Sequence, residues 1–211
     1  MSVIKIHGAA PSTCTKRVAT VCIELGLKYE IVEIDYKNNA HKRPEYLENF
    51  HPFGIVPVLE DTDGTKVYES RAIARYLTAK YGKDSGLLPP TSDLKAYGLF
   101  EQAASIEYSA FDPSASGLVA QRVFNPRFGK EVNEVLATHF ETTLENKLEG
   151  YERVLSKQKY LAGDHVTLAD LFHLPYGSLV QNIDPDLMGS KPNVQRWWAD
   201  ISSRESWKSL N

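Results

Sequence analysis

Strand and helix signals alternate along the first eighty residues of the chain, and then the strand signals stop. A short β-branched run at residues 3–6 leads into the turn sequence Gly-Ala-Ala-Pro. The apolar residues of the segment 13–25 repeat at helical spacing as far as Gly26, and residues 29–34 then alternate apolar and charged side chains. Because the first pattern suits a strand, the second an amphipathic helix and the third a partly buried strand, the segment predicts a βαβ unit.

A ββα unit is predicted directly after it. A short helix is expected near residues 44–50, and residues 56–60 are typical of a strand. Asp63-Gly64 is a hairpin turn signal that leads into a second strand at residues 66–68. A helix is then expected from about residue 71 to residue 81, with Ser70 placed to cap its N-terminus.

The composition changes at the end of this region. Residues 82–90 hold two glycines and two prolines, which is typical of a linker between domains. We therefore expect an α/β domain over residues 1–82, a linker over 83–91 and an all-α domain over 92–211. Pro175 is expected to kink the third of the later helices. Those helices are predicted near residues 92–112, 128–156, 167–180, 191–202 and 204–209.

Charge and cysteine content exclude several classes of protein. The 211 residues hold 24 Lys and Arg against 27 Asp and Glu, a formal net charge of −3, which argues against a nucleic-acid-binding surface. No run of about 18 apolar residues is present, so no membrane segment is expected. Cys14 and Cys22 would lie roughly 12 Å apart on one helix, beyond disulfide reach. Two unpaired thiols and no glycosylation sequon favour a protein of the cytoplasm.

Pro11-Ser12-Thr13-Cys14 stands at the predicted start of the first helix. Free backbone N–H groups and the helix dipole favour an anion such as a thiolate at this point, and a hydroxyl group can donate to sulfur. Taken alone, Ser12 is more simply explained as a helix cap. Cys14 is likewise more simply a packed thiol, although a helix N-terminus also suits a reactive thiolate.

A second group of residues surrounds Val56-Pro57. A cis peptide bond here would leave the N–H and C=O groups of Val56 free to pair with a peptide ligand, as an added strand does. Glu69-Ser70 then opens the next helix, where N–H groups suit a ligand carboxylate and Glu69 suits an ammonium group. All three groups follow or precede strands of one sheet, and together they predict a site for a small anionic peptide.

These motifs resemble those of the glutathione transferases. The sequences Pro-Phe-Gly-x-Val-Pro and Glu-Ser-Arg-Ala-Ile-x-x-Tyr resemble their thioredoxin-like domain, and Ser-Thr-x-x-x-Arg-Val from Ser12 to Val18 is similar to the phi class of plants and fungi. Residues 160–170 resemble a capping-box motif of the helical domain, with Thr167 and Asp170 as its two members. The resemblance covers nearly the whole chain and implies a thioredoxin-like domain followed by an all-helical one.

The resemblance also implies roles for single residues. Ser12 would stabilise the thiolate of bound glutathione for attack on apolar electrophiles in alkyl or aryl transfer, with peroxide reduction as a further activity. Detoxification is the implied purpose, and glutathione the co-substrate. The glutathione-binding residues would be His41 and Lys42 at the glycine carboxylate, Val56 and a cis Pro57 at the cysteinyl backbone, and Glu69 and Ser70 at the γ-glutamyl end.

Three further features follow from the same resemblance. Thr13, Tyr108 and Phe111 are candidates for the electrophile pocket, although the two aromatic residues are more simply core residues. Phe53 resembles the aromatic residue that such proteins insert into a partner subunit, which implies a homodimer. Ile55 stands where phi-class relatives commonly carry glutamine, and this predicts weaker glutathione binding.

Two other functions fit the same fold. A thiol/disulfide oxidoreductase would act through Cys14, and a non-catalytic carrier would bind glutathione and apolar compounds. No metal site is expected, because the six histidines lack companions at metal-ligand spacing.

Overall fold

The structure, a computed structural model, describes residues 3–36 and 38–210. The chain forms two compact units, Met1–Leu88 with Glu205–Asn211 and Pro89–Arg204. This division differs from the predicted one, because residues 83–88 and the C-terminal residues from Glu205 belong to the first unit. Residues 1, 2 and 211, at the ends of the predicted domains, lie outside the described residues.

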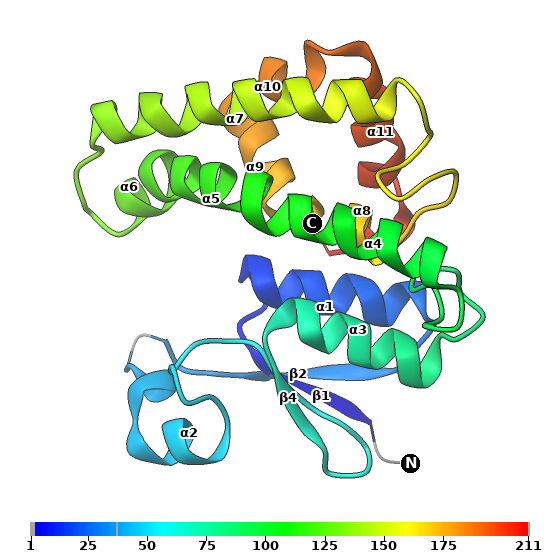
Figure 1. The fold of residues 1–211 in the computed structure, drawn as a ribbon. Helices are drawn as coiled ribbons and strands as arrows, with labels where there is room; N and C mark the ends of the chain where they lie inside the picture. Colours follow the sequence, from blue (N-terminus) through cyan, green and yellow to red (C-terminus); the bar gives the residue numbers. More distant parts are fainter. Residues whose placement is uncertain (1–2, 37, 211) are drawn as a thin grey trace. The chain divides into compact units, whose positions relative to one another are not determined.

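The first unit contains a four-stranded sheet in the order β2-β1-β3-β4 (Figure 1). Strand β1 pairs in parallel with β2 and antiparallel with β3, and β3 pairs antiparallel with β4. The predicted βαβ and ββα units are therefore confirmed, except that the third strand begins two residues later than expected. The strands are β1 (Ile4–Gly8), β2 (Tyr29–Glu33), β3 (Val58–Glu60) and β4 (Lys66–Tyr68).

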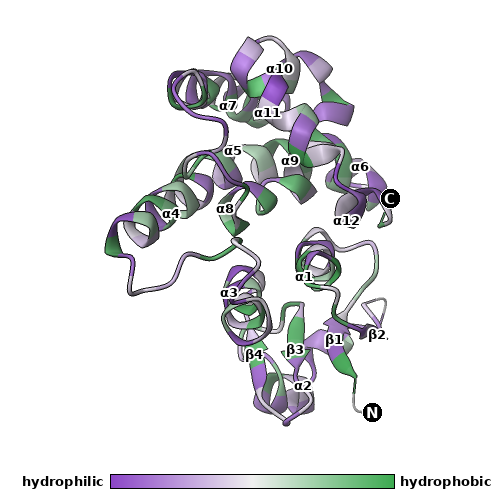
Figure 2. Ribbon diagram, turned by 90° about the vertical axis from the view of Figure 1, so that its right-hand side faces the viewer, coloured by the Kyte–Doolittle hydropathy of each residue, from purple (hydrophilic) through white to green (hydrophobic). Residues whose placement is uncertain are grey.

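Helices α1 (Thr13–Glu24) and α3 (Ser70–Tyr81) lie side by side on one face of this sheet (Figures 1 and 2). Their apolar stripes are fully buried, as Val18 and Leu77 illustrate. The short helix α2 (Pro44–Asn49) packs Tyr46 against Val58 in a separate small core. Helix α12 (Glu205–Lys208) returns to α1, where the Ser206 hydroxyl donates to the carboxylate of Glu24.

Asp61 connects the β3–β4 hairpin to α3. Its buried carboxylate accepts hydrogen bonds from the hydroxyls of Tyr76 and Tyr81 and from Lys80 Nζ, each at 2.6 Å. Burial by itself would raise the pKa of this carboxyl group, but the hydrogen bonds from Lys80, Tyr76 and Tyr81 outweigh it and lower the pKa. The hairpin is thus held against the helix whose N-terminus carries Glu69.

The second unit opens with helical turns that run from α4 (Leu94–Ile106) through α5 (Asp112–Val119) to α6 (Asn125–Arg127). The predicted end near residue 112 is therefore wrong. A wider π-helical turn precedes each of two prolines in this run, Glu107–Phe111 before Pro113 and Ala120–Phe124 before Pro126. Such a turn accommodates a proline ring that would clash with the carbonyl group four residues back in an ordinary α-helix.

The later helices also depart from prediction in detail. The long helix begins at residue 134 rather than 128, and a short helix near residue 185 was not expected. Pro175 does not kink one continuous helix; the helix breaks at residues 172–173, and Pro175 lies in the first turn of a new one. No helix among the described residues is long and apolar enough to span a membrane. The remaining helices are α7 (Glu134–Leu155), α8 (Leu168–Leu171), α9 (Leu174–Ile183), α10 (Pro185–Gly189) and α11 (Pro192–Ser202).

A fully buried carboxylate, Asp170, organises the core of the second unit. It accepts from the backbone N–H of Leu161 at 3.0 Å, from the backbone N–H and hydroxyl of Thr167 at 2.9 and 3.2 Å, and from Trp197 Nε1 at 2.9 Å. The predicted capping box of Thr167 and Asp170 is confirmed. Asp170 thereby joins the loop before α8 to α11 as well as capping its own helix.

Substitutions in the capping box should destabilise the second unit, and the effect should grow with the number of hydrogen-bond donors that lose their acceptor. We expect Thr167→Ala to lower the free energy of unfolding by about 1 kcal/mol and Asp170→Ala by about 3 kcal/mol, because Asp170→Ala leaves several buried donors unsatisfied. Urea titration followed by fluorescence measures both values. Thr142→Ala, at an exposed position of α7, is the control; equal effects of Thr142→Ala and Thr167→Ala would contradict the capping role.

The Asp61 cluster predicts a pH-dependent difference in stability. Because the folded pKa of Asp61 lies below that of the unfolded chain, its stabilisation is present above about pH 4 and is lost as the pH falls further. Asp61→Asn should therefore cost about 2 kcal/mol at pH 7 and clearly less at pH 3. Urea titrations at both pH values test this, with the exposed Asp84→Asn as the control; a cost that stays constant with pH would refute it.

Candidate active site

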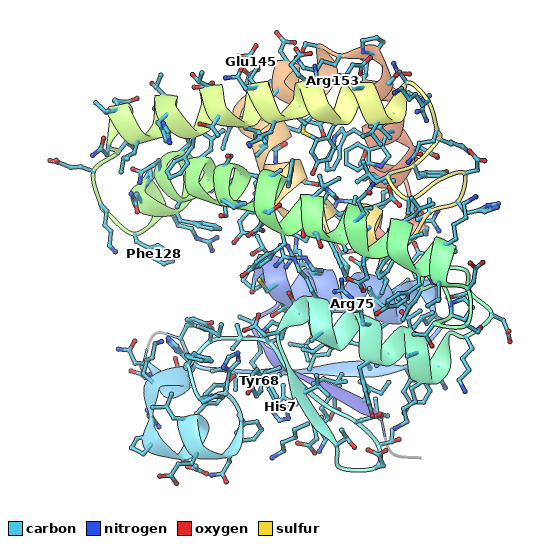
Figure 3. All side chains as sticks on the ribbon, in the orientation of Figure 1. His7, Tyr68, Arg75, Phe128, Glu145 and Arg153 are labelled. Atoms are coloured by element: carbon cyan, nitrogen blue, oxygen red, sulfur yellow. The ribbon has the colours of Figure 1, made fainter. Side chains whose placement is uncertain are left out.

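The strand register brings four segments to one end of the sheet. His7 of β1 pairs with Val32 of β2 and with Val58 of β3, and Val58 pairs with Tyr68 of β4. Figure 3 labels His7 and Tyr68, which lie on either side of β3 in this row. The chain leaves β1, β2 and β4 and enters β3 at this end. The segments that carry Ser12, Val56 with Pro57, and Glu69 with Ser70 therefore all emerge there, as the sequence predicted. The segment that carries His41 with Lys42, which the resemblance added, emerges at the same end.

Ser12 is the N-cap of α1. Its backbone is extended, and its half-buried hydroxyl oxygen accepts from the N–H of Thr15 at 3.4 Å. This distance is long for a hydrogen bond, so the cap interaction is weak. A serine hydroxyl that accepts in this way keeps its own proton for donation. The capping role and the ability to donate to a ligand at the helix N-terminus are thus compatible.

Arg17 connects the start of α1 to the start of α3. Its buried Nη1 donates to the hydroxyl of Ser70 at 2.8 Å and lies 3.5 Å from the half-buried sulfur of Cys14. The expectation that Ser70 caps α3 is therefore wrong, because the N-cap is Glu69 and the Ser70 hydroxyl accepts from Arg17. Sequence reasoning missed this role of Arg17; the available signal was a charged residue beside the apolar stripe of α1.

Glu69 has a left-handed backbone conformation, with φ of 70°. This is unfavourable for a residue other than glycine, and residues held in this way cluster at functional sites. Its side chain is 58% exposed and does not cap α3, and its carboxylate Oε1 lies 3.7 Å from Nε2 of the buried His51. The carboxylate is thus accessible to a cationic group.

His41 and Lys42 lie in a 3₁₀ turn, Ala40–Lys42, after β2. His41 is buried, with its ring stacked on Tyr36 at 4.1 Å, and burial together with the charge of Lys42 lowers its pKa, so the imidazole is neutral at pH 7. Lys42 Nζ donates to the carbonyl oxygen of Phe53 at 3.2 Å. Gly54 has φ of 60°, and a Cβ atom there would lie 2.6 Å from the His41 carbonyl oxygen, so only glycine allows these two loops to approach so closely.

The Val56-Pro57 peptide bond is cis, as expected. The ladders of the described strands end at Val58, so Val56 lies outside them while its side chain packs in the small core with Tyr46. The Tyr46 hydroxyl donates to the carbonyl oxygen of Ile55 at 2.9 Å and so holds the Ile55-Val56 peptide group, which precedes the cis bond. This geometry suits pairing of the Val56 backbone with an extended ligand.

The remaining candidates are distributed over both units. Phe53 is 72% exposed and Ile55 43% exposed, while Thr13 is half-buried. In the second unit, Tyr108 is 65% exposed on the π-helical turn, whereas Phe111 is buried with its ring 4.7 Å from that of His173. Phe111 therefore packs in the core. No cluster of three or more His, Cys, Asp or Glu side chains suited to a metal ion occurs among residues 3–36 and 38–210.

Two family models match the chain. The one described as "Glutathione S-transferase, N-terminal domain" matches residues 11–80, and the one described as "Glutathione S-transferase, C-terminal domain" matches residues 111–205. Glutathione S-transferase PM239X14 of Arabidopsis thaliana is 60% identical over 199 residues, which span 94% of this chain and 91% of the relative.

Solved structures show the same relationship. The crystal structure of glutathione transferase F7 from Populus trichocarpa matches with a TM-score of 0.92 at 35% identity, covering 99% of this chain and 97% of that chain. Glutathione S-transferase I from maize, solved in complex with an atrazine glutathione conjugate, matches with a TM-score of 0.91 at 30% identity, covering 99% and 96%. The chain therefore belongs to the glutathione S-transferase family, in its phi class, and is a glutathione-transferring enzyme.

Proposed function

We propose that this enzyme conjugates glutathione to apolar electrophiles and that Ser12 keeps the glutathione sulfur ionised. The observation that supports this most strongly is the convergence of the four candidate segments at one end of the sheet, with the Ser12 hydroxyl at the N-terminus of α1. A thiolate bound there meets a hydroxyl donor and the positive end of a helix dipole.

The energies involved are sufficient for this role. A free thiol titrates near pH 8.5, so lowering its pKa by about 2 units requires roughly 2.7 kcal/mol of preferential stabilisation of the thiolate. A hydrogen bond to a charged group contributes about 1.5–3 kcal/mol, and a helix N-terminus about 0.3–1 kcal/mol. Ser12 and the first turn of α1 together cover that difference. Ionisation of the nucleophile is thus the step that the protein promotes.

The other segments would hold the two ends of the tripeptide. Lys42 and His41 suit the glycine carboxylate, Val56 and the cis Pro57 suit the cysteinyl backbone, and Glu69 with Ser70 suits the γ-glutamyl end. The exposed carboxylate of Glu69 supports an ammonium partner. Ile55 presents an exposed apolar side chain where an amide would add a hydrogen bond, so affinity for glutathione would be reduced.

The electrophile would be apolar, and Thr13 and Tyr108 are proposed to contact it. Phe111 is buried in the core of the second unit, so we do not propose that it contacts the electrophile. Peroxides are a second proposed class of substrate, since a thiolate attacks their O–O bond as it attacks an electrophilic carbon. Detoxification in the cytoplasm fits these substrates and the two free cysteines.

One observation favours a second function. Cys14 lies at the N-terminus of α1 with Arg17 Nη1 at 3.5 Å from its sulfur, and a nearby cation stabilises a thiolate. A thiol/disulfide exchange reaction through Cys14 is therefore the alternative to Ser12-assisted conjugation. A third candidate function is that of a carrier that binds glutathione without turnover.

The Ser12→Ala variant distinguishes these functions. We expect its kcat/KM with a chlorodinitrobenzene-type electrophile to fall about tenfold to a hundredfold, because the hydrogen bond from the hydroxyl group, about 1.5–3 kcal/mol of thiolate stabilisation, is lost while the helix N-terminus remains. Ser12→Thr keeps a hydroxyl group and should retain much more activity, whereas Cys14→Ser should retain it fully. Ultraviolet absorbance of bound thiolate against pH measures the shift directly.

Other results would reassign the site. Conjugation that survives Ser12→Ala removes Ser12 from the mechanism, and disulfide reductase activity that disappears only in Cys14→Ser establishes the second function. Binding of glutathione without turnover in either assay would identify a carrier.

We further propose that the enzyme is a homodimer in which Phe53 inserts into the partner subunit. Phe53 is 72% exposed, so its ring is accessible to a second subunit. Phe53→Ala should shift the mass measured by size-exclusion light scattering from dimer towards monomer at micromolar concentration. Phe128, which is 71% exposed and labelled in Figure 3, gives the matched control, and Phe128→Ala should remain dimeric; an unchanged dimer in Phe53→Ala would remove Phe53 from the interface.

A further inference from the structure

His51 is a buried polar residue to which neither the sequence motifs nor the proposed mechanism assigns a role. It lies in the loop between α2 and β3 and is 1% exposed. Its ring is 4.6 Å from the ring of Tyr68, which directly precedes Glu69, and 6.0 Å from the ring of Phe53. His51 therefore lies between the Phe53 loop and the segment that carries Glu69.

The hydrogen bonds of His51 determine which ring nitrogen carries its proton. The backbone N–H of Phe53 points to Nδ1 at 3.3 Å, and because a backbone N–H can only donate, Nδ1 must accept. Burial is the largest influence on this histidine and lowers its pKa, with Lys42 acting in the same direction and Glu69 against it. The imidazole is therefore neutral at pH 7, with its proton on Nε2.

The Glu69 carboxylate lies near the Nε2 atom of His51. Nε2 is buried and has no hydrogen-bond partner within the described part of the chain, and Glu69 Oε1 is 3.7 Å away. A buried donor without an acceptor is unfavourable, whereas the Glu69 side chain is exposed and able to rotate. A small rotation of Glu69 would bring the two atoms within hydrogen-bond distance.

We propose that His51 is a positioning residue for glutathione: its Nε2–H donates to the Glu69 carboxylate and orients that carboxylate toward the γ-glutamyl ammonium group. The inference rests on the proposed role of Glu69 in glutathione binding and adds the residue that holds it. The neutral imidazole fixes one carboxylate oxygen and leaves the other for the ligand. The same ring accepts from Phe53, so the proposed dimer loop and the γ-glutamyl site share one support.

Two substitutions separate the two hydrogen bonds of His51. His51→Asn places an amide near the position of Nδ1, so that it accepts from Phe53 while the donor to Glu69 is lost. His51→Gln extends an amide N–H to about the position of Nε2 and keeps that donor. Two ligands show whether a change in affinity depends on the γ-glutamyl amino group. One is glutathione, and the other is glutaryl-cysteinyl-glycine, which lacks only that amino group. Calorimetric titration of each variant with each ligand gives the dissociation constants.

We expect His51→Asn to weaken glutathione binding about fivefold and to leave binding of glutaryl-cysteinyl-glycine unchanged, because only the first ligand uses the oriented carboxylate. His51→Gln should bind glutathione within about twofold of the wild type. In turnover, KM for glutathione should rise in His51→Asn while kcat at saturation is preserved. His7→Asn, which disrupts a partly buried histidine–carboxylate pair between His7 Nε2 and Glu60 Oε2 at 3.0 Å, should change neither ligand's affinity.

Other results of these titrations would contradict the proposal. Equal weakening of both ligands in His51→Asn, or no weakening of either, would overturn the positioning role. If His51→Asn does not fold, His51→Phe replaces it, since a phenyl ring keeps the packing against Tyr68. A wild-type enzyme that binds the two ligands equally would instead refute the role of Glu69 in the proposed function. If the wild type and the His51 variants all prefer glutathione over glutaryl-cysteinyl-glycine to the same degree, only the positioning role of His51 is refuted.

Discussion

The antiparallel register that sets Val58 opposite both His7 and Tyr68 is the constraint on which the proposed site depends. Side chains alternate across a sheet, so a slip of one residue in β3 would move Val58 to the opposite face and shift the Val56-Pro57 segment relative to its neighbours. Burial of Leu59 and Val58 on opposite faces resists such a slip. The positions of Ser12, Val56 and Glu69 follow from this register, because each lies only a few residues from a strand end.

Buried polar residues hold in place the segments that the register brings to this end of the sheet. Arg17 ties the first turn of α1 to Ser70, the Asp61 cluster holds the β3–β4 hairpin against α3, and His51 lies behind Glu69. Three of the groups proposed to touch the ligand, Ser12, Lys42 and Glu69, are exposed or half-buried. Such an arrangement suits a binding site, since supports that are buried and hydrogen-bonded keep accessible groups in place before the ligand arrives.

The helical unit is organised around a different kind of constraint. Burial raises the pKa of Asp170, and its hydrogen bonds with Leu161, Thr167 and Trp197 act in the opposite direction. A buried carboxylate is tolerated only when its oxygens are satisfied in this way, so the loop, α8 and α11 are held in one arrangement. The π-helical turns before Pro113 and Pro126 add a second adjustment, which lets one helical run continue through two prolines.

The sequence by itself determined the features that arise from neighbouring residues. The βαβ and ββα order, the helix that begins after Ser12, the turn at Asp63-Gly64 and the capping box of Thr167 and Asp170 all follow from local preferences within a few residues, and the family motifs added the cis bond at Pro57. The tertiary structure alone decided the rest. Arg17 and Ser70, which are 53 residues apart in the chain, form a buried hydrogen bond. His51 and Glu69 are likewise brought close together only by the folded sheet. Contacts of this kind depend on the packing of distant segments, which no local pattern of residue types encodes.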